Sequence, residues 1–116
     1  MKKVLLAVFV GLFLLSGCGK KEALSSDKIY YFYSESCSHC KEASAYISQH
    51  YPDLEMIKVD VTTKAGYDMI IKCAQKFKLG NRIGTPLFCM GDRYIMGWSD
   101  RDAAKFNAYI KPYLDK

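Results

Sequence analysis

The stretch "YYFYSESCSHCKE", residues 30–42, places two cysteines with two residues between them directly after a run of aromatic side chains. Aromatic and β-branched residues with no Gly or Pro are typical of a buried strand, which we expect over residues 28–34. Apolar residues then recur at helical spacing, so a helix is predicted to begin at the cysteine pair. Cys37 and Cys40 therefore fall where a strand passes into a helix, a place that suits a redox pair, half of a metal site or a structural cross-link.

Turn residues and periodicity define the other expected elements. Pro52-Asp53 ends the first helix, and alternating apolar residues predict a second strand over residues 54–61. A second helix is predicted over residues 62–79, with Gly80 as its C-cap. The domain should end in a strand over residues 87–90, a returning strand over residues 93–98 after a turn at Gly91-Asp92, and a helix that is capped by Ser99 and ends near Pro112.

The expected order of elements is βαβ-α-ββα. The first two strands are predicted to be parallel because a helix connects them, and the last two antiparallel because a short turn connects them. An α/β domain with a four-stranded mixed sheet and helices on both faces satisfies the rules for such connections. The length of 116 residues is that of one small domain.

The first residues of the chain indicate export. Lys2-Lys3 precedes "VLLAVFVGLFLL" at residues 4–15, an apolar run of 12 residues that suits a signal peptide better than the ~20-residue span of a membrane helix. The last of these residues begins "LSGC" at residues 15–18, which resembles the bacterial lipobox, whose cysteine is lipidated and becomes the first residue of the mature protein. In this chain that cysteine is Cys18. The alternatives are a membrane-spanning anchor and an ordinary signal peptide.

Cys18 divides the chain into three expected parts. Residues 1–17 would be a lipoprotein signal peptide, residues 18–27 the lipidated cysteine with a flexible tether, and residues 28–116 the folded domain. We expect a location in the cell envelope, outside the cytoplasm, where an inner membrane, an outer membrane and a Gram-positive surface all fit. Without the two N-terminal lysines, 15 basic residues stand against 12 acidic ones, a balance too even to indicate nucleic-acid binding.

Export changes the interpretation of the remaining cysteines, because disulfides persist outside the cytosol. Cys73 lies on the apolar stripe of the second predicted helix, and Cys89 lies in the third predicted strand. They would be buried free thiols, or a second disulfide that ties helix to sheet and stabilises by about 2–4 kcal/mol. A third alternative is electron exchange with the first pair.

Three features of the domain resemble the thioredoxin-like superfamily. These are "CSHC" at a strand–helix junction, Thr85-Pro86 directly before a strand, and the Gly91 hairpin followed by Gly97 and a terminal helix. The resemblance covers residues 28–114, and it implies a thioredoxin-like fold. It further implies that Pro86 is cis, and that the backbone of Thr85 pairs with a bound polypeptide beside this proline.

The resemblance also implies a role for each residue of the motif. Cys37, at the helix N-terminus, would be the attacking thiol because that position favours a thiolate, and the more shielded Cys40 would be the resolving thiol. His39 stands where DsbA-like oxidases have a histidine, which would stabilise the thiolate and favour oxidation of substrates. Ser38 replaces the proline common in the family, which leaves the turn less rigid.

The chain departs from the family in other places. Thioredoxins carry a buried acid six residues before the first cysteine, where this chain has Tyr31. Glu35 is a substitute for that acid or a solvated loop charge. Residues 62–85 leave room for one helix only, so the DsbA-type helical insertion is not expected. A dimerisation domain of the isomerase type is not expected either, which disfavours an isomerase.

We therefore expect a membrane-tethered thiol–disulfide oxidoreductase, monomeric and without cofactor or metal, that acts on exported cysteine-containing proteins. A membrane redox partner would return the cysteine pair to its starting oxidation state. Cell-surface reductases that receive electrons from a membrane donor use the same fold. The alternative is a lipoprotein that binds or delivers Cu(I) or Zn(II) through Cys37, Cys40 and His39. His50 is expected on the surface. The third hypothesis is an adaptor that only binds peptides.

Overall fold

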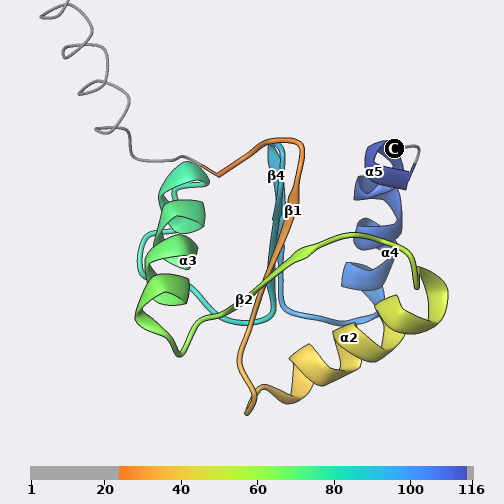
Figure 1. Cartoon of the computed structure of the whole chain (residues 1–116), viewed down its shortest axis with the longest axis horizontal. Helices are drawn as coiled ribbons and strands as arrows, with labels where there is room; N and C mark the ends of the chain where they lie inside the picture. The colour runs from red at the N-terminus through yellow and green to blue at the C-terminus, as the bar shows by residue number, and fades with distance from the viewer. Residues whose placement is uncertain (1–23, 115–116) are drawn as a thin grey trace, which may run out of the picture.

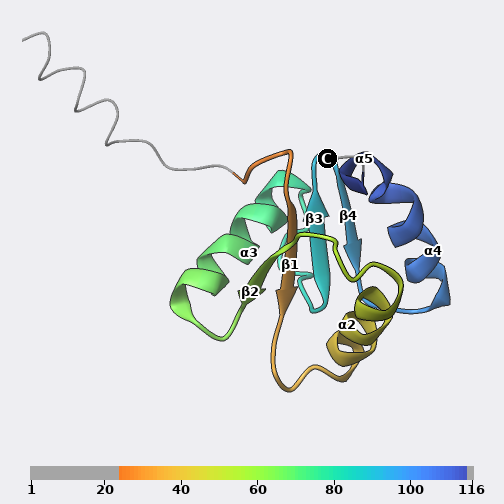
Figure 2. The ribbon, with the colours of Figure 1, turned by 45° about the vertical axis from the view of Figure 1, so that its right-hand side comes forward.

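The computed structural model describes residues 24–114. Its elements, in chain order, are β1 (Ile29–Tyr33), α2 (Ser38–His50), β2 (Ile57–Asp60), α3 (Lys64–Lys76), β3 (Leu87–Met90), β4 (Arg93–Met96), α4 (Asp100–Tyr109) and α5 (Lys111–Leu114). The four strands form one sheet in the order β2-β1-β3-β4. β1 pairs with β2 in parallel and with β3 antiparallel, and β4 is antiparallel to β3 (Figure 2). The predicted α/β domain with a four-stranded mixed sheet is confirmed.

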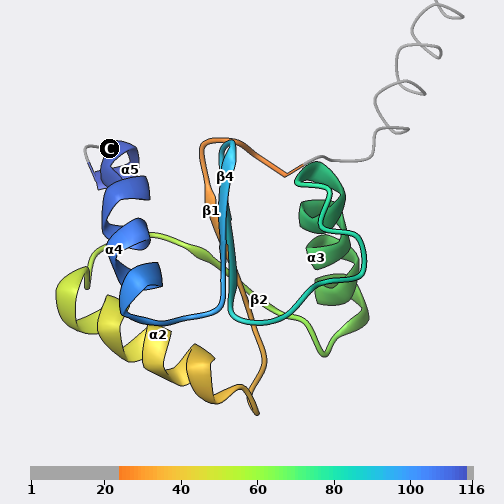
Figure 3. The ribbon, with the colours of Figure 1, turned by 180° about the vertical axis from the view of Figure 1, so that it is seen from behind.

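Helices cover both faces of the sheet. Seen along the edge of the sheet, α3 lies on one side, whereas α2, α4 and α5 lie on the other, and the view from behind agrees (Figures 1 and 3). Two hydrophobic clusters fill the spaces between these layers. The predicted signal peptide and Cys18 lie outside the described residues. Within residues 24–114, no helix is both long and apolar enough to cross a membrane.

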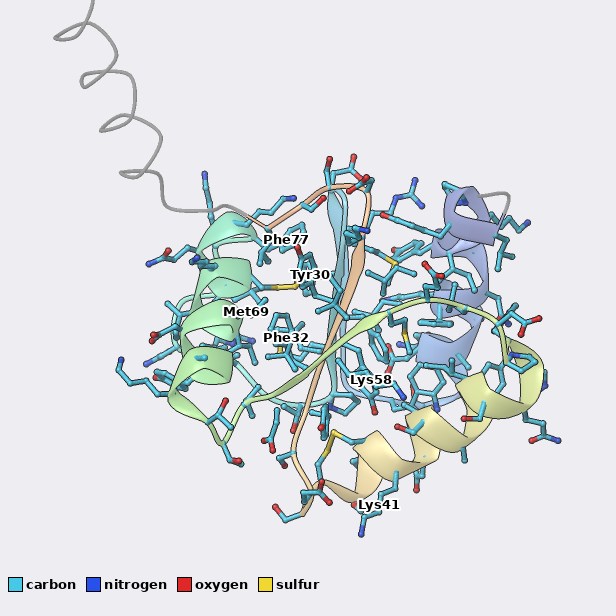
Figure 4. The ribbon with its side chains drawn as sticks, in the orientation of Figure 1. Tyr30, Phe32, Lys41, Lys58, Met69 and Phe77 are labelled. Carbon is cyan, nitrogen blue, oxygen red and sulfur yellow. A yellow bond between two sulfur atoms is a disulfide. The ribbon has the colours of Figure 1, made fainter. Side chains whose placement is uncertain are left out.

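β1 contributes buried side chains to both clusters, as β3 also does. Ile29 and Tyr31 enter the cluster beside α2 and α4, whereas Tyr30 and Phe32 enter the cluster beside α3. Figure 4 shows Tyr30 and Phe32 pointing toward α3. Successive side chains of a strand point to opposite faces, so a central strand that is covered on both sides is apolar throughout. This is why the aromatic run has no polar alternation.

β2 is shorter than the predicted strand because it lies at an edge of the sheet. Only Ile57–Asp60 pairs with β1. Leu54 and Met56, which precede it, instead pack against the cluster beside α2 and α4. The Ile57 side chain is 37% exposed, which fits the open end of an edge strand.

α3 ends earlier than predicted, and its cap is not Gly80. The C-cap is Phe77, and Lys78 follows it with a φ of 56°. The Lys78 N–H donates to the Gln75 carbonyl at 3.3 Å, and the Leu79 N–H donates to the Ala74 carbonyl at 2.8 Å. These two bonds define a Schellman motif with a lysine in the left-handed position.

The predicted final helix is interrupted. Ser99 caps α4 by accepting a hydrogen bond from the Asp102 N–H at 3.3 Å, as predicted, but α4 ends at Tyr109. The short helix α5 follows and carries Pro112 in its first turn, a position that tolerates proline. Pro112 therefore lies inside a second helix rather than ending the first.

Candidate functional site

The first cysteine pair lies at the start of α2. Cys37 is the N-cap of the helix, and its sulfur accepts a hydrogen bond from the Cys40 N–H at 3.1 Å. The two residues form a disulfide with a Cα–Cα distance of 5.2 Å (Figure 4). The backbone N–H groups of the first helical turn have no partner within the helix, so this position favours negative charge on the capping sulfur.

The two sulfur-bearing residues differ in exposure. Cys37 is half-buried, whereas Cys40 is only 3% exposed. The loop before them is held by a hydrogen bond from the Cys37 N–H to the Ser34 carbonyl at 3.2 Å. An incoming thiolate can therefore reach Cys37 more readily than Cys40, and exchange depends on access to the attacked sulfur.

The two residues between the cysteines both face solvent. Ser38 and His39 form the exposed first turn of α2. The His39 Nδ1 atom lies 3.1 Å from the Glu42 carboxylate, with both side chains more than half exposed. Glu35 is also exposed, so it does not take the place of a buried acid.

Tyr31, six residues before Cys37, contacts the second cysteine of the pair. Its hydroxyl donates to the Cys40 carbonyl at 2.8 Å and lies 2.7 Å from the Ser44 hydroxyl. Burial raises the pKa of the Tyr31 hydroxyl, and the Ser44 hydrogen bond offsets part of that rise. In the sequence, Tyr31 was noted only because it lies six residues before Cys37. The contact with Ser44, one turn after Cys40, was not predicted, because helical spacing places Cys40 and Ser44 on one face but does not show that this face meets β1.

Thr85 and Pro86 lie at the same end of the sheet as the cysteine pair. The peptide bond between them is cis. The antiparallel register pairs Leu87 with Phe32, so these two residues come beside the connection from β1 to α2. Pro86 is buried and Thr85 half-buried, and the Pro86 carbonyl accepts a hydrogen bond from the Gly97 N–H at 2.8 Å.

Cys73 and Cys89 are joined in a second disulfide, with a Cα–Cα distance of 6.4 Å. It ties α3 to β3, and both residues lie in the cluster on the α3 face. Cys89 pairs with Tyr30, near the end of β1 away from the first cysteine pair. The structure therefore does not bring the two disulfides together.

The donors needed for a metal site do not gather in residues 24–114. No group of three or more His, Cys, Asp and Glu side chains there could hold an ion. His39 is turned toward Glu42, and the exposed His50 contacts the carbonyl of Tyr46 through Nδ1 at 3.0 Å.

Comparison with known proteins gave no match. No family model, no curated protein and no solved structure is significantly similar to this chain.

Proposed function

We propose that this chain is a thioredoxin-like thiol–disulfide oxidoreductase that exchanges disulfides with exported proteins. The observation that carries the proposal is the disulfide at the N-terminus of α2, with Cys37 accessible and Cys40 buried. The order of elements, the mixed sheet and the cis bond before β3 support the thioredoxin-like assignment.

In the oxidising direction, a substrate thiolate attacks the Cys37 sulfur. The Cys37–Cys40 bond breaks, a mixed disulfide forms with Cys37, and the Cys40 thiolate leaves and takes up a proton. A second substrate thiolate then attacks the substrate sulfur of the mixed disulfide and releases Cys37 as a thiolate. The substrate loses two electrons and two protons, which the cysteine pair gains once both thiols are protonated. A disulfide-donating partner at the membrane would return the pair to its oxidised form.

Interactions that would stabilise the reduced pair favour the oxidising direction over the reducing one. The Cys40 N–H, which contacts the Cys37 sulfur in the disulfide, would donate to the Cys37 thiolate after reduction. A protonated His39 on the same turn would add favourable charge. Stabilising the reduced form makes the disulfide a stronger oxidant.

Thr85 gives the proposed enzyme a place to hold its substrate. It is half-buried, and it lies outside the hydrogen-bonded part of β3, at the same end of the sheet as Cys37. An extended substrate segment could pair with the Thr85 backbone as an added strand. We place the enzyme in the cell envelope, tethered through Cys18.

The test measures exchange directly. The purified chain is assayed for oxidative refolding of a reduced protein and for reduction of insulin. Cys37→Ala should abolish both activities, and Cys40→Ala should accumulate mixed disulfides whose partners are identified by mass spectrometry. Ser36→Ala, a change of an exposed residue in the same loop, should leave both unchanged. Full activity of Cys37→Ala would refute the proposal.

A further inference from the structure

We propose that Tyr31, held by Ser44, is a positioning residue that aims the Cys40 N–H at the Cys37 sulfur and thereby stabilises the reduced pair. The inference rests on the proposed function, because it concerns a pair that cycles between disulfide and dithiol. It assigns a role to two residues outside the CxxC motif. Neither needs to contact a substrate.

The Tyr31 ring is held firmly in the core. It is 2% exposed and stacks on Phe88, with ring centroids 4.7 Å apart and planes 7° from parallel. A ring packed in this way keeps its hydroxyl at one place. That hydroxyl lies against the first two turns of α2, where it meets Cys40 and Ser44.

Two hydrogen bonds run in one direction, from the Ser44 hydroxyl to the Tyr31 hydroxyl and from there to the Cys40 carbonyl. The Tyr31 hydroxyl has one hydrogen, which it donates to the Cys40 carbonyl, so the Ser44 hydroxyl must donate to the Tyr31 oxygen. The raised pKa of Tyr31 keeps that hydrogen in place at neutral pH. Since Cys40 and Ser44 are one helical turn apart, the tyrosine links the start of α2 to β1.

This link acts on the cysteine whose backbone faces the reactive sulfur. The same residue that accepts from Tyr31 through its carbonyl donates its N–H to Cys37 at 3.1 Å. In the disulfide that N–H meets a neutral sulfur, whereas in the dithiol it meets a thiolate and forms a stronger, charge-assisted bond. Holding the turn therefore favours the reduced form more than the oxidised form.

The test compares Tyr31→Phe with Ser44→Ala. Both remove one hydroxyl, and the first keeps the stacked ring. Tyr33→Phe is the matched control, because it removes a hydroxyl from the same face of β1 that makes no hydrogen bond within the described residues. Two quantities are measured: the equilibrium constant of the pair with glutathione, and the pH midpoint of Cys37 alkylation in the reduced protein.

Tyr31→Phe should raise the alkylation midpoint by about half a unit to one unit and make the pair about three- to tenfold less oxidising. A tenfold change corresponds to about 30 mV. Ser44→Ala should shift both quantities in the same direction by less. Tyr33→Phe should shift neither.

A purely structural role gives a different result. If Tyr31→Phe lowers the stability of oxidised and reduced protein equally and moves neither quantity, the proposal is wrong. If Tyr31→Phe does not fold, an unchanged midpoint in Ser44→Ala refutes it and a raised midpoint supports it. If the wild type equilibrates with glutathione but acts on no protein, the proposed function fails while the alkylation midpoints still decide the role of Tyr31.

Discussion

The two disulfides of this domain differ in their surroundings, since one lies near the surface and the other lies in the core. Cys37–Cys40 spans a sequence separation of 3 at the tip of a helix, with one cysteine half-exposed. Cys73–Cys89 spans a separation of 16 inside the core, with exposures of 0% and 2%. The first joins neighbours in a single turn, and the second joins a helix to a central strand.

The two bonds differ in the length of the loop that they close and in their exposure. Loop length affects the free energy of unfolding, and exposure affects exchange with a thiolate. A cross-link stabilises mainly by restricting the unfolded chain, and a loop of about 15 residues is worth about 3 kcal/mol. The Cys37–Cys40 loop is too short to tie distant parts together, so its position at a helix N-terminus matters more. Burial protects the second bond from attack by a thiolate, because exchange requires access to a sulfur.

The largest expected contrast is in the rate of reduction. Under native conditions, a dithiol reductant followed by alkylation should label Cys37 and Cys40 but neither Cys73 nor Cys89. Reduction of Cys73–Cys89 should be at least about 100-fold slower, since it requires opening of the core. Mass spectrometry of the labelled chain measures both rates. In denaturant all these cysteines should be labelled together, and equal native rates would remove the distinction.

The double change Cys73→Ala/Cys89→Ala should come next in size. It should lower the free energy of unfolding by about 2–5 kcal/mol, which denaturant titration measures. The glutathione equilibrium of Cys37–Cys40 should stay the same because the two pairs share no contact. An altered equilibrium constant would show that the regions are coupled.

The α2 helix, which carries Cys37–Cys40 at its start, is supported by Asn107. This α4 side chain accepts hydrogen bonds from the hydroxyls of Tyr46 at 3.1 Å and Tyr51 at 2.7 Å. Asn107→Ala should cost about 1–3 kcal/mol, because two partly buried hydroxyls lose their acceptor. Hydrogen exchange should increase in α2 more than in α3. Asn81→Ala, in an exposed loop, should have almost no effect, and faster exchange in α3 alone would contradict the assignment.

The smallest expected effect is at the end of α3, the helix that carries Cys73. Lys78→Gly should stabilise by about 0.5–1 kcal/mol, because glycine adopts the positive φ of this position without strain. The converse change, Gly80→Ala at a φ of 67°, should destabilise. Thermal unfolding measures both. A loss of stability in Lys78→Gly would show that the lysine side chain matters more than its backbone.

These residues also show how far sequence reasoning reached. The aromatic run, the cysteine spacing and the hairpin at Gly91 are local signals, and each led to the observed element. The predicted end of α3 was wrong because packing, and not a local sequence signal, determines where this helix stops. Leu79 packs into the cluster on the α3 face, and the chain must turn directly after Phe77 to bring it there.

The candidate site was predictable only in part, for a similar reason. The position of Cys37 at a helix N-terminus follows from neighbouring residues. The bond between Cys73 and Cys89 depends on a distance between α3 and β3 that no local pattern contains. The Tyr31–Ser44 contact depends on how α2 is rotated against β1, which the packing of the whole cluster decides.

The hydrogen bonds made by the residues just before β1 have a consequence for the direction in which the cysteine pair faces. Before β1 begins, the Ser25 N–H donates to the Tyr30 hydroxyl at 2.9 Å, and the Ser26 carbonyl accepts from Tyr113 at 3.3 Å. The chain is thus fastened at the end of β1 away from Cys37, a strand length of roughly 16 Å. A domain attached to a surface through this side would hold its cysteine pair outward, toward proteins that arrive from the surrounding solution rather than from the surface beneath it.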